Sequence, residues 1–353
     1  MLVPVKIRDR NLVVLLDTGS EASSIDTSVA TELGLKSVGT EQILKNFRNL
    51  TVDLTEAESI RIGKSIFNHA KLAEITLAPL SQALGTTVDG VLGNDILQDL
   101  TFKLSYLKQQ LLVGPLPSLG SLGQSVELRR SDGQFLVPVS FVSTPGTFVF
   151  DTGTNSTNLG WKTWELVTRT WAPRETIEGI MRAGNPTSPA ILVCLPTVQL
   201  GNTTLKDQVV RAQTKSDAGA FSSADFSGIP GSDILRQFEI TFDLKHDKVF
   251  LQRDENYQPD PYRYVTIGIQ IAKDPRNGMQ VMSVWKDSPA AEAGVRPGDR
   301  LEAVNGQPIE PLTLAQVSSK FHAEEGTAVR LTIERNSVPI PACIARICNQ
   351  SST

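Results

Sequence analysis

An internal repeat constrains this chain more than any other feature of its sequence. Asp17-Thr18-Gly19 recurs 134 positions later as Asp151-Thr152-Gly153, and Val3-Pro4-Val5 has a counterpart at the same spacing. Farther along, Gly93-Asn94-Asp95-Ile96-Leu97 matches Gly231-Ser232-Asp233-Ile234-Leu235 at a spacing of 138. All of these matches align the two halves in the same order, with one four-residue insertion in the second half that changes the spacing from 134 to 138. The sequence therefore predicts two halves that arose by duplication and fold alike.

Each half is expected to be mainly β. The short apolar runs Leu12–Leu16 and Thr147–Phe150 are typical of buried strands, and each leads into an Asp-Thr-Gly turn. Alternating apolar and polar residues predict half-buried strands at 100–104 and 238–242. A short helix is expected at the start of each Gly-Asn/Ser-Asp-Ile-Leu segment.

Linker-like segments divide the chain into three parts. Residues 114–125 are rich in Gly, Pro and Ser, and residues 252–263 are polar and contain two prolines. We therefore expect a first lobe at 1–115, a second lobe at 116–253 and a C-terminal domain at 264–346. The composition of the second linker predicts that the two lobes work without the C-terminal domain.

The second lobe has a candidate strand, Val126–Leu128, whose counterpart in the first lobe would begin before Met1. The first lobe thus has the pattern expected if a leader peptide has been removed. Such a leader would place the protein in a bacterial cell envelope or periplasm.

Charge and residue usage exclude several classes of function. A net charge of −4 with scattered basic residues argues against a nucleic-acid partner. Three histidines and three cysteines give no metal-ligand spacing, so neither a metal nor a cofactor is expected. The scarcity of His also argues against Ser–His–Asp and Cys–His catalysis. Cys343 and Cys348 are either a C-terminal pair or inert thiols.

A duplicated Asp on a tight turn has a chemical explanation. Two like lobes related by a pseudo-two-fold axis would bring Asp17 and Asp151 face to face. Two carboxylates a few ångströms apart cannot both ionise, so they share one proton. Such a pair supplies a general base that activates a water and a general acid that assists the leaving group.

The residues around each Asp suit this role. The glycines allow a sharp turn, the following threonines can hydrogen-bond across the lobe junction, and the last residue of each turn offers a hydroxyl to the carboxylate. These supporting residues are Thr18, Gly19, Ser20, Thr152, Gly153 and Thr154.

Here the sequence resembles a known family. Asp-Thr-Gly-Ser and Asp-Thr-Gly-Thr, followed by Val91-Leu92-Gly93 and Ile229-Pro230-Gly231, are similar to the paired signatures of retropepsin-like aspartic proteases. The resemblance covers roughly residues 1–253. It implies two pseudo-symmetric β-barrel lobes, ψ-shaped crossings at Gly93 and Gly231, and substrate-covering hairpins near 42–52 and 179–189. Pro230 departs from the family's aliphatic residue.

The last domain resembles a bacterial-type PDZ domain. The resemblance is carried by Ser288–Val295, Arg296–Leu301 and Ala303–Ile309. Physically, Pro289 can begin a short helix, Gly294 can end it, and Asn305-Gly306 favours a hairpin turn. The resemblance implies a carboxylate-binding loop and a groove walled by residues 314–321, although Thr266 replaces the usual first glycine. The implied peptide-binding residues are Ile267, Gly268 and Ile269.

These features together predict a mainly β protein with two retropepsin-like lobes and an α+β PDZ domain. The function we expect is an aspartic endopeptidase in which Asp17 and Asp151 activate a water. Protein or peptide substrates and a C-terminal peptide ligand of the PDZ domain are the expected partners. A monomer is expected because both lobes lie on one chain. The alternatives are a catalytically silent peptide-binding scaffold, an enzyme latent until the PDZ domain binds, and a PDZ domain that only packs against the lobes.

Overall fold

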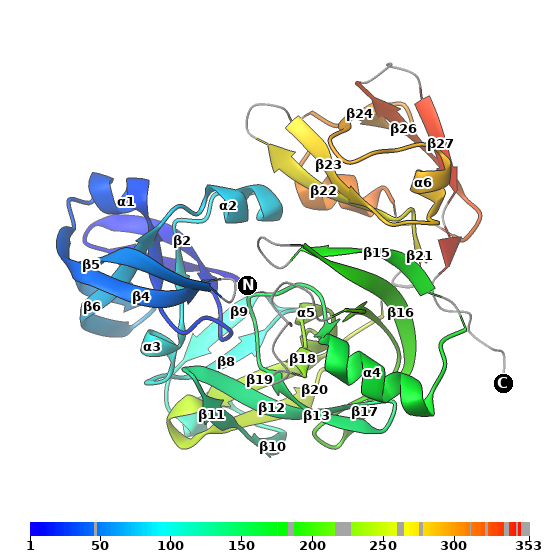
Figure 1. Ribbon diagram of the computed structural model, residues 1–353. Helices are drawn as coiled ribbons and strands as arrows, with labels where there is room; N and C mark the ends of the chain where they lie inside the picture. Colours follow the sequence, from blue (N-terminus) through cyan, green and yellow to red (C-terminus); the bar gives the residue numbers. More distant parts are fainter. Residues whose placement is uncertain are drawn as a thin grey trace.

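The computed structural model describes the chain apart from residues 46–47, 175, 183–186, 216–226, 260–264, 275–277, 311, 322–323, 335–338, 344 and 347–353. The described chain is mainly β, as the sequence predicts. Two lobes built largely of strands are followed by a smaller C-terminal domain (Figure 1).

The first lobe is a seven-stranded sheet with strand order β1-β2-β7-β3-β6-β5-β4, and a β1–β5 pairing curls it toward a barrel. Its strands are β1 (Leu2–Ile7), β2 (Arg10–Leu16), β3 (Ser24–Asp26), β4 (Lys36–Lys45), β5 (Arg48–Ile62), β6 (Ser65–Ile75) and β7 (Gly90–Leu92). Its helices are α1 (Thr27–Glu32), α2 (Ala78–Leu84) and α3 (Asn94–Leu97).

The second lobe repeats the main features of the first. In both lobes a hairpin of long strands lies between the Asp-Thr-Gly turn and the ψ-crossing segment. Its strands are β11 (Arg129–Ser131), β12 (Gln134–Phe141), β13 (Thr144–Val149), β14 (Asn158–Leu159), β15 (Thr176–Arg182), β16 (Thr187–Leu200), β17 (Thr203–Gln213) and β18 (Gly228–Ile229). Its helices are α4 (Trp161–Thr170) and α5 (Ser232–Leu235).

A five-stranded sheet joins the two lobes. Lobe one contributes β8 (Thr101–Ser105) and β9 (Gln110–Val113), and lobe two contributes β10 (Gln124–Glu127), β19 (Phe238–Asp243) and β20 (Lys248–Arg253). Strands β8 and β19 pair antiparallel with Phe102 opposite Phe242, and these rings stack at 4.6 Å. One hydrophobic core therefore runs through both lobes.

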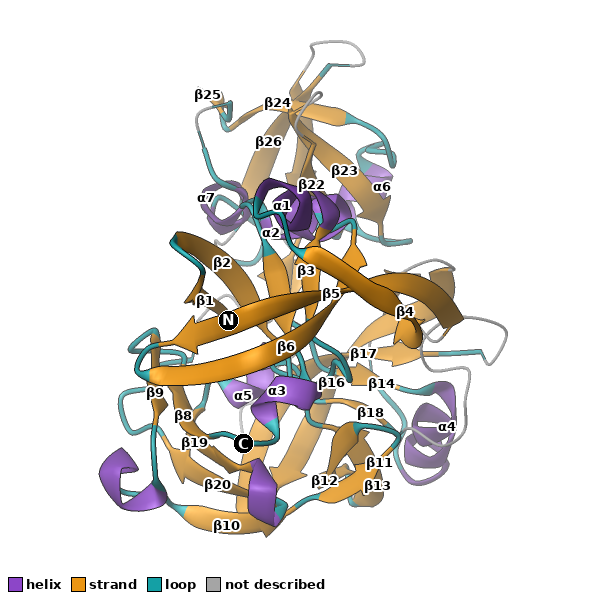
Figure 2. Cartoon of the chain, turned by 90° about the vertical axis from the view of Figure 1, so that its left-hand side faces the viewer, coloured by secondary structure: helices purple, strands orange, loops and turns teal. Residues whose placement is uncertain are grey.

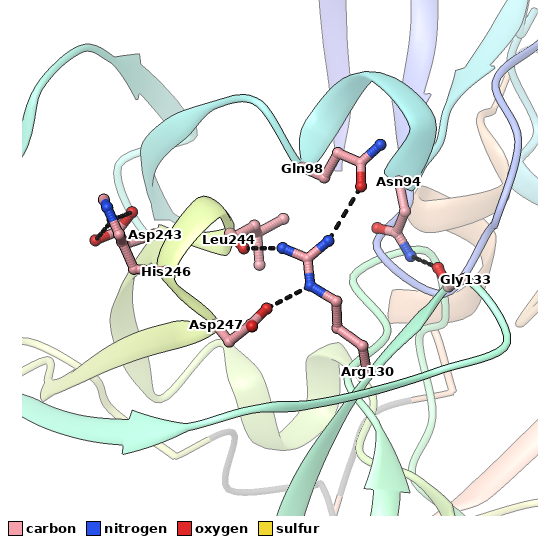
Figure 3. A network of polar contacts seen from close by, with 8 residues as sticks. All are labelled: Asn94, Gln98, Arg130, Gly133, Asp243, Leu244, His246 and Asp247. Atoms are coloured by element: carbon pink, nitrogen blue, oxygen red, sulfur yellow. Dashed lines mark hydrogen bonds and ion pairs between the residues drawn. The ribbon is translucent and has the colours of Figure 1, made fainter.

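Polar contacts also link the lobes (Figure 3). Arg130 of β11 donates from Nε to Asp247 at 2.5 Å and from Nη2 to the Leu244 carbonyl at 2.6 Å. Its Nη1 reaches Gln98, which directly follows α3 of the first lobe, at 3.1 Å. Nearby, Asn94 Nδ2 of α3 donates to the Gly133 carbonyl at 2.9 Å. The start of lobe two is thus tied to the helix that follows the crossing of lobe one.

The C-terminal domain has its own core and a sheet of order β22-β23-β24-β26-β27. Its strands are β21 (Val265–Thr266), β22 (Ile269–Asp274), β23 (Gly278–Val284), β24 (Arg300–Val304), β25 (Gln307–Pro308), β26 (Ala328–Ile333), β27 (Pro339–Cys343) and β28 (Ala345–Arg346). Its helices are α6 (Pro289–Glu292) and α7 (Leu314–Ser319).

Local sequence explains the turns of this domain. Pro289 begins α6, with the Ser288 side chain accepting from the Ala291 amide as an N-cap. Asn305 and Gly306 have φ values of 51° and 77°, the left-handed pair that a tight hairpin between β24 and β25 requires. The predicted short helix and hairpin are both present.

The cysteines differ from expectation. Cys194 of β16 is disulfide-bonded. Because the chain has only two other cysteines, this bond excludes the pair Cys343–Cys348, whose side chains lie outside the described residues. Among the described helices, none is both long and apolar enough to cross a membrane.

Candidate active site

The two repeated aspartates come together at the junction of the lobes. Asp17 follows β2, and its amide donates to the Leu92 carbonyl of β7 at 3.0 Å. Asp151 follows Phe150, whose amide donates to the Phe135 carbonyl of β12 at 2.8 Å. Each aspartate is therefore held at the end of a buried strand.

Two threonines fix the junction by reciprocal hydrogen bonds. Thr18 Oγ1 donates to the Phe150 carbonyl at 2.6 Å and accepts from the Thr152 amide at 3.1 Å. Thr152 Oγ1 donates to the Leu16 carbonyl at 2.9 Å and accepts from the Thr18 amide at 3.1 Å. Both threonines are buried. The predicted contact of the threonines across the lobe junction is present.

The glycines of the two turns allow the carboxyls to approach. A Cβ on Gly19 would lie 2.5 Å from Asp151 Cγ, and one on Gly153 would lie 2.4 Å from Asp17 Cγ. Each glycine thus leaves room for the aspartate of the opposite lobe. The Gly19 amide donates to Asp17 Oδ1 at 2.9 Å, and the Gly153 amide donates to Asp151 Oδ1 at 2.6 Å.

The two carboxyls hydrogen-bond to each other and differ in their electrostatics. Burial raises the pKa of Asp17, while hydrogen bonds from Asp151 and from the Gly19 and Ser20 amides oppose that rise. Burial, the charge of Asp17 and the hydrogen bond to Asp17 together raise the pKa of Asp151 well above its usual value. Because both carboxyls are buried against each other, the arrangement favours one proton shared by the pair.

The last residue of each turn acts differently from the prediction. The Ser20 hydroxyl donates to the Ala22 carbonyl at 3.1 Å, and the Thr154 hydroxyl lies 3.5 Å from the Ser156 carbonyl. The Thr154 backbone amide, not its hydroxyl, donates to Asp151 Oδ1 at 3.2 Å. These side chains therefore close the turns, because a hydroxyl bonds most readily to main-chain groups two residues away.

Behind the turns lies a second pair of carboxylates that sequence reasoning missed. Asp95 accepts from the Ser23 amide and hydroxyl at 2.9 and 2.6 Å. Asp233 accepts from the Thr157 amide and hydroxyl at 2.8 and 2.7 Å. The signal was in the repeat, since Asp95 and Asp233 belong to its matching pentapeptides.

The same hydroxyls hold the two crossing glycines. Ser23 Oγ accepts from the Gly93 amide at 2.9 Å, and Thr157 Oγ1 accepts from the Gly231 amide at 3.0 Å. A Cβ on Gly93 would lie 2.6 Å from the Ala22 backbone, and one on Gly231 would lie 2.4 Å from the Ser156 backbone. Only glycine fits where each crossing passes behind its Asp-Thr-Gly turn.

The predicted substrate-covering hairpins fall on β4–β5 and on β15–β16, whose turns lie outside the described residues. A cavity of about 430 Å³ separates β16 from the segment that follows the second turn. Its lining includes Leu192 of β16, Asn155, Ser156, and Arg211 of β17. Within the described ranges, no group of three or more His, Cys, Asp or Glu side chains could hold a metal.

The predicted peptide-binding loop of the C-terminal domain lies at the start of β22. Ile267 and Ile269 pack into the domain core, and Gly268 has a φ of 81°. A Cβ on Gly268 would lie 2.1 Å from Ser288 Cβ, so this close turn requires glycine. Strand β22 is at the edge of its sheet, and helix α7 contacts β22.

Two parts of the chain match known protein families. Residues 3–96 match an aspartyl-protease family, and residues 280–335 match the PDZ-domain family. The chain therefore combines an aspartyl-protease domain with a C-terminal PDZ domain.

Two curated proteins are similar to a short segment of the chain. A probable CtpA-like serine protease of Staphylococcus saprophyticus is 40% identical over 72 residues, which is 20% of this chain and 14% of that protein. A probable CtpA-like serine protease of Staphylococcus haemolyticus is 39% identical over 74 residues, 21% of this chain and 15% of that protein. The chain thus covers a small part of these relatives.

Proposed function

We propose that this protein is an aspartic endopeptidase that hydrolyses peptide bonds with a water activated between Asp17 and Asp151. The observation that supports it most is the buried carboxyl pair at the lobe junction, where the glycine of each turn leaves room for the opposite aspartate and the pKa of both carboxyls is raised. Such a pair offers a base and an acid at one place, which is what amide hydrolysis by water needs.

With one shared proton, one aspartate acts as the base and the other as the acid. Ionised Asp17 takes a proton from the attacking water, while protonated Asp151 donates its hydrogen to the oxygen of the scissile carbonyl. The water oxygen bonds to the carbonyl carbon and gives a tetrahedral gem-diol. The nitrogen then takes the proton held by Asp17, the C–N bond breaks, and a diol proton returns to Asp151. The products are a carboxylic acid and an amine, and the pair again holds one proton.

The serine-protease names of the relatives favour a second candidate, a serine catalytic centre. The alignments cover too little of those proteins to carry that chemistry to this chain. His69 bonds Glu56 at 2.9 Å, His246 bonds Asp243 at 2.8 Å, and His322 lies outside the described residues. Neither described imidazole hydrogen-bonds a serine hydroxyl, which a Ser–His pair would require.

The PDZ domain supports a peptide-binding role. The left-handed turn at Gly268 and the edge strand β22 are suited to adding a peptide as a further strand beside α7. We propose that this groove binds the C-terminal segment of a substrate or partner and that Ile267, Gly268 and Ile269 form its closed end.

The test is digestion of a peptide library at several pH values by the wild type and by Asp17→Asn and Asp151→Asn. Both variants should lose hydrolysis while keeping the fold, because an amide can neither take the proton from water nor supply one. Asp9→Asn, at an exposed aspartate, is the matched control and should keep full activity. Substantial turnover by either dyad variant, or inhibition by a serine-directed reagent but not by pepstatin, would overturn the proposal.

A further inference from the structure

The PDZ domain is packed onto the β15–β16 hairpin of lobe two (Figure 1). Trp285, the residue after β23, is only 3% exposed, yet it lies outside the PDZ core. Its indole packs with Ala190 and Leu192 of β16 and with Ile177 of β15. Lobe two therefore buries this side chain of the PDZ domain, although a linker separates the two in the chain.

A glycine in the hairpin makes room for this indole. A Cβ on Gly179 of β15 would lie 2.3 Å from Trp285 Cε3 and 2.5 Å from Cδ2. The ring thus lies directly on the β15 backbone, in a contact that any larger side chain would block. Strand β15 pairs with β16 from Thr176 to Arg182, so a contact at Gly179 acts on the middle of that ladder.

Polar contacts flank the indole on the same hairpin and on the adjacent strand. Lys286 Nζ lies 3.1 Å from Glu178 Oε2. Gln270 of β22 lies beside Arg211 of β17, and its amide oxygen, when turned to the guanidinium, accepts from Nη2 and Nη1 at 3.0 and 3.3 Å.

The contacted residues are also walls of the cavity beside the catalytic turn. Leu192 packs in the cluster of Trp285, and Arg211 faces Gln270. Both line the 430 Å³ cavity, together with Asn155 and Ser156 of the segment after the second Asp-Thr-Gly. A shift of the indole would therefore move the Leu192 wall of a space that lies only a few residues along the chain from Asp151.

The PDZ domain contacts lobe one as well. Helix α2 packs on β22, and a Cβ on Gly85 would lie 2.7 Å from Leu314 Cβ at the start of α7. The cartoon places α2 next to β22 and α7 in a second view (Figure 2). The domain thus bridges both lobes, and α2 lies against the two elements that border its peptide groove.

We propose that Trp285 is a positioning residue for peptide hydrolysis, holding the β15–β16 hairpin where it can cover substrate. The inference rests on the proposed function. It makes the PDZ domain a part of the catalytic architecture, whereas the linker composition alone predicts a separable module. A chain ending at Arg253 is then expected to cleave short peptides poorly even if its lobes are folded.

The experiment uses the full chain and a short peptide amide, which has no carboxylate for the PDZ loop. Trp285→Ala should lower kcat/KM by about 10- to 100-fold, mainly through KM, because a loose hairpin weakens binding without altering the dyad. Trp285→Phe should recover much of the loss. Arg330→Ala, at an exposed site on β26, is the matched control and should behave as wild type.

A double-mutant cycle distinguishes the loss of the Trp285–Gly179 contact from a general loss of stability. Gly179→Ala should have the effect of Trp285→Ala, because its methyl would displace the indole. In the Trp285→Ala background it should add little, since the group it clashes with is gone. Fully additive losses, or two single variants with wild-type KM, would overturn the inference. If Trp285→Ala does not fold, Gly179→Ala alone decides, because it leaves the PDZ sequence intact.

Amide hydrogen exchange of β15 and β16 provides a readout that needs no activity. In the Asp17→Asn background, Trp285→Ala should speed exchange in this hairpin while β4 and β5 stay unchanged. Faster exchange in this background, combined with a wild type whose hydrolysis is unaffected by Asp17→Asn, would support the docking and reject the proposed function. Unchanged exchange together with unchanged KM would reject the positioning role and leave the dyad chemistry intact.

Discussion

The reciprocal threonine bonds predict a large cost for Thr18→Val. Valine keeps the shape of threonine but leaves the Phe150 carbonyl and the Thr152 amide without the partners that Thr18 Oγ1 provides at 2.6 and 3.1 Å. Thr18 is 0% exposed, so water cannot replace the lost hydroxyl. An orphaned buried polar group costs about 1–3 kcal/mol, so the two give a loss of about 2–6 kcal/mol in the free energy of unfolding.

The assay is urea unfolding of the lobes at fixed pH, followed with kcat/KM for a short peptide. Thr18→Ser keeps the hydroxyl and should lose only about 1 kcal/mol for one buried methyl. Thr204→Val, on an exposed position of β17, is the control for the substitution itself and should be nearly neutral. If Thr18→Val is as stable as Thr204→Val, the bonds across the junction do not hold the lobes together.

Three further predictions concern the dyad. Activity should fall as pH rises, because the pair must keep its one proton, and a rate that keeps climbing above neutrality would contradict this. The pKa of Asp151 is raised in the folded state, so its contribution to stability is present below about pH 4 and is lost as pH rises through the folded pKa. Asp151→Asn should therefore be inactive but more stable than the wild type at pH 7. In urea unfolding, this difference in the free energy of unfolding should disappear near pH 4. Gly153→Ala should lower kcat/KM by more than about tenfold, because its methyl would lie 2.4 Å from Asp17 Cγ. Gly63→Ala controls for glycine replacement away from the dyad: its φ of 58° strains an alanine, but the methyl meets no atom within 4 Å, so kcat/KM should stay at the wild-type value. Equal kcat/KM for the two variants would refute the steric argument.

Much of the architecture could be predicted from local pattern. The buried strands before each turn, the short helices α3 and α5, and the hairpin at Asn305-Gly306 all lie where the sequence indicates. These features depend on periodicity and on turn residues that act over a few positions. The repeat also predicted a contact between residues far apart in the chain, because a pseudo-two-fold axis between two like lobes brings equivalent turns face to face.

Side-chain partners at the site were less predictable. The sequence indicated hydroxyls of Ser20 and Thr154 beside the carboxyls, but these bond main-chain carbonyls within their own turns. It did not indicate the carboxylates of Asp95 and Asp233 behind the turns, although the repeat contained both. A residue type gives the bonds that a side chain can make, whereas the neighbouring backbone decides which of them forms.

By itself, the sequence determined two lobes, the paired aspartates and a C-terminal PDZ domain. Only the tertiary structure decided that Asp151 has the more strongly raised pKa, and that the indole of Trp285 lies on Gly179 of another domain. The first depends on burial and on the charge of a residue 134 positions away, and the second on the fit of two surfaces. Neither leaves a periodic trace in the chain, because complementarity between distant segments exists only once both have folded.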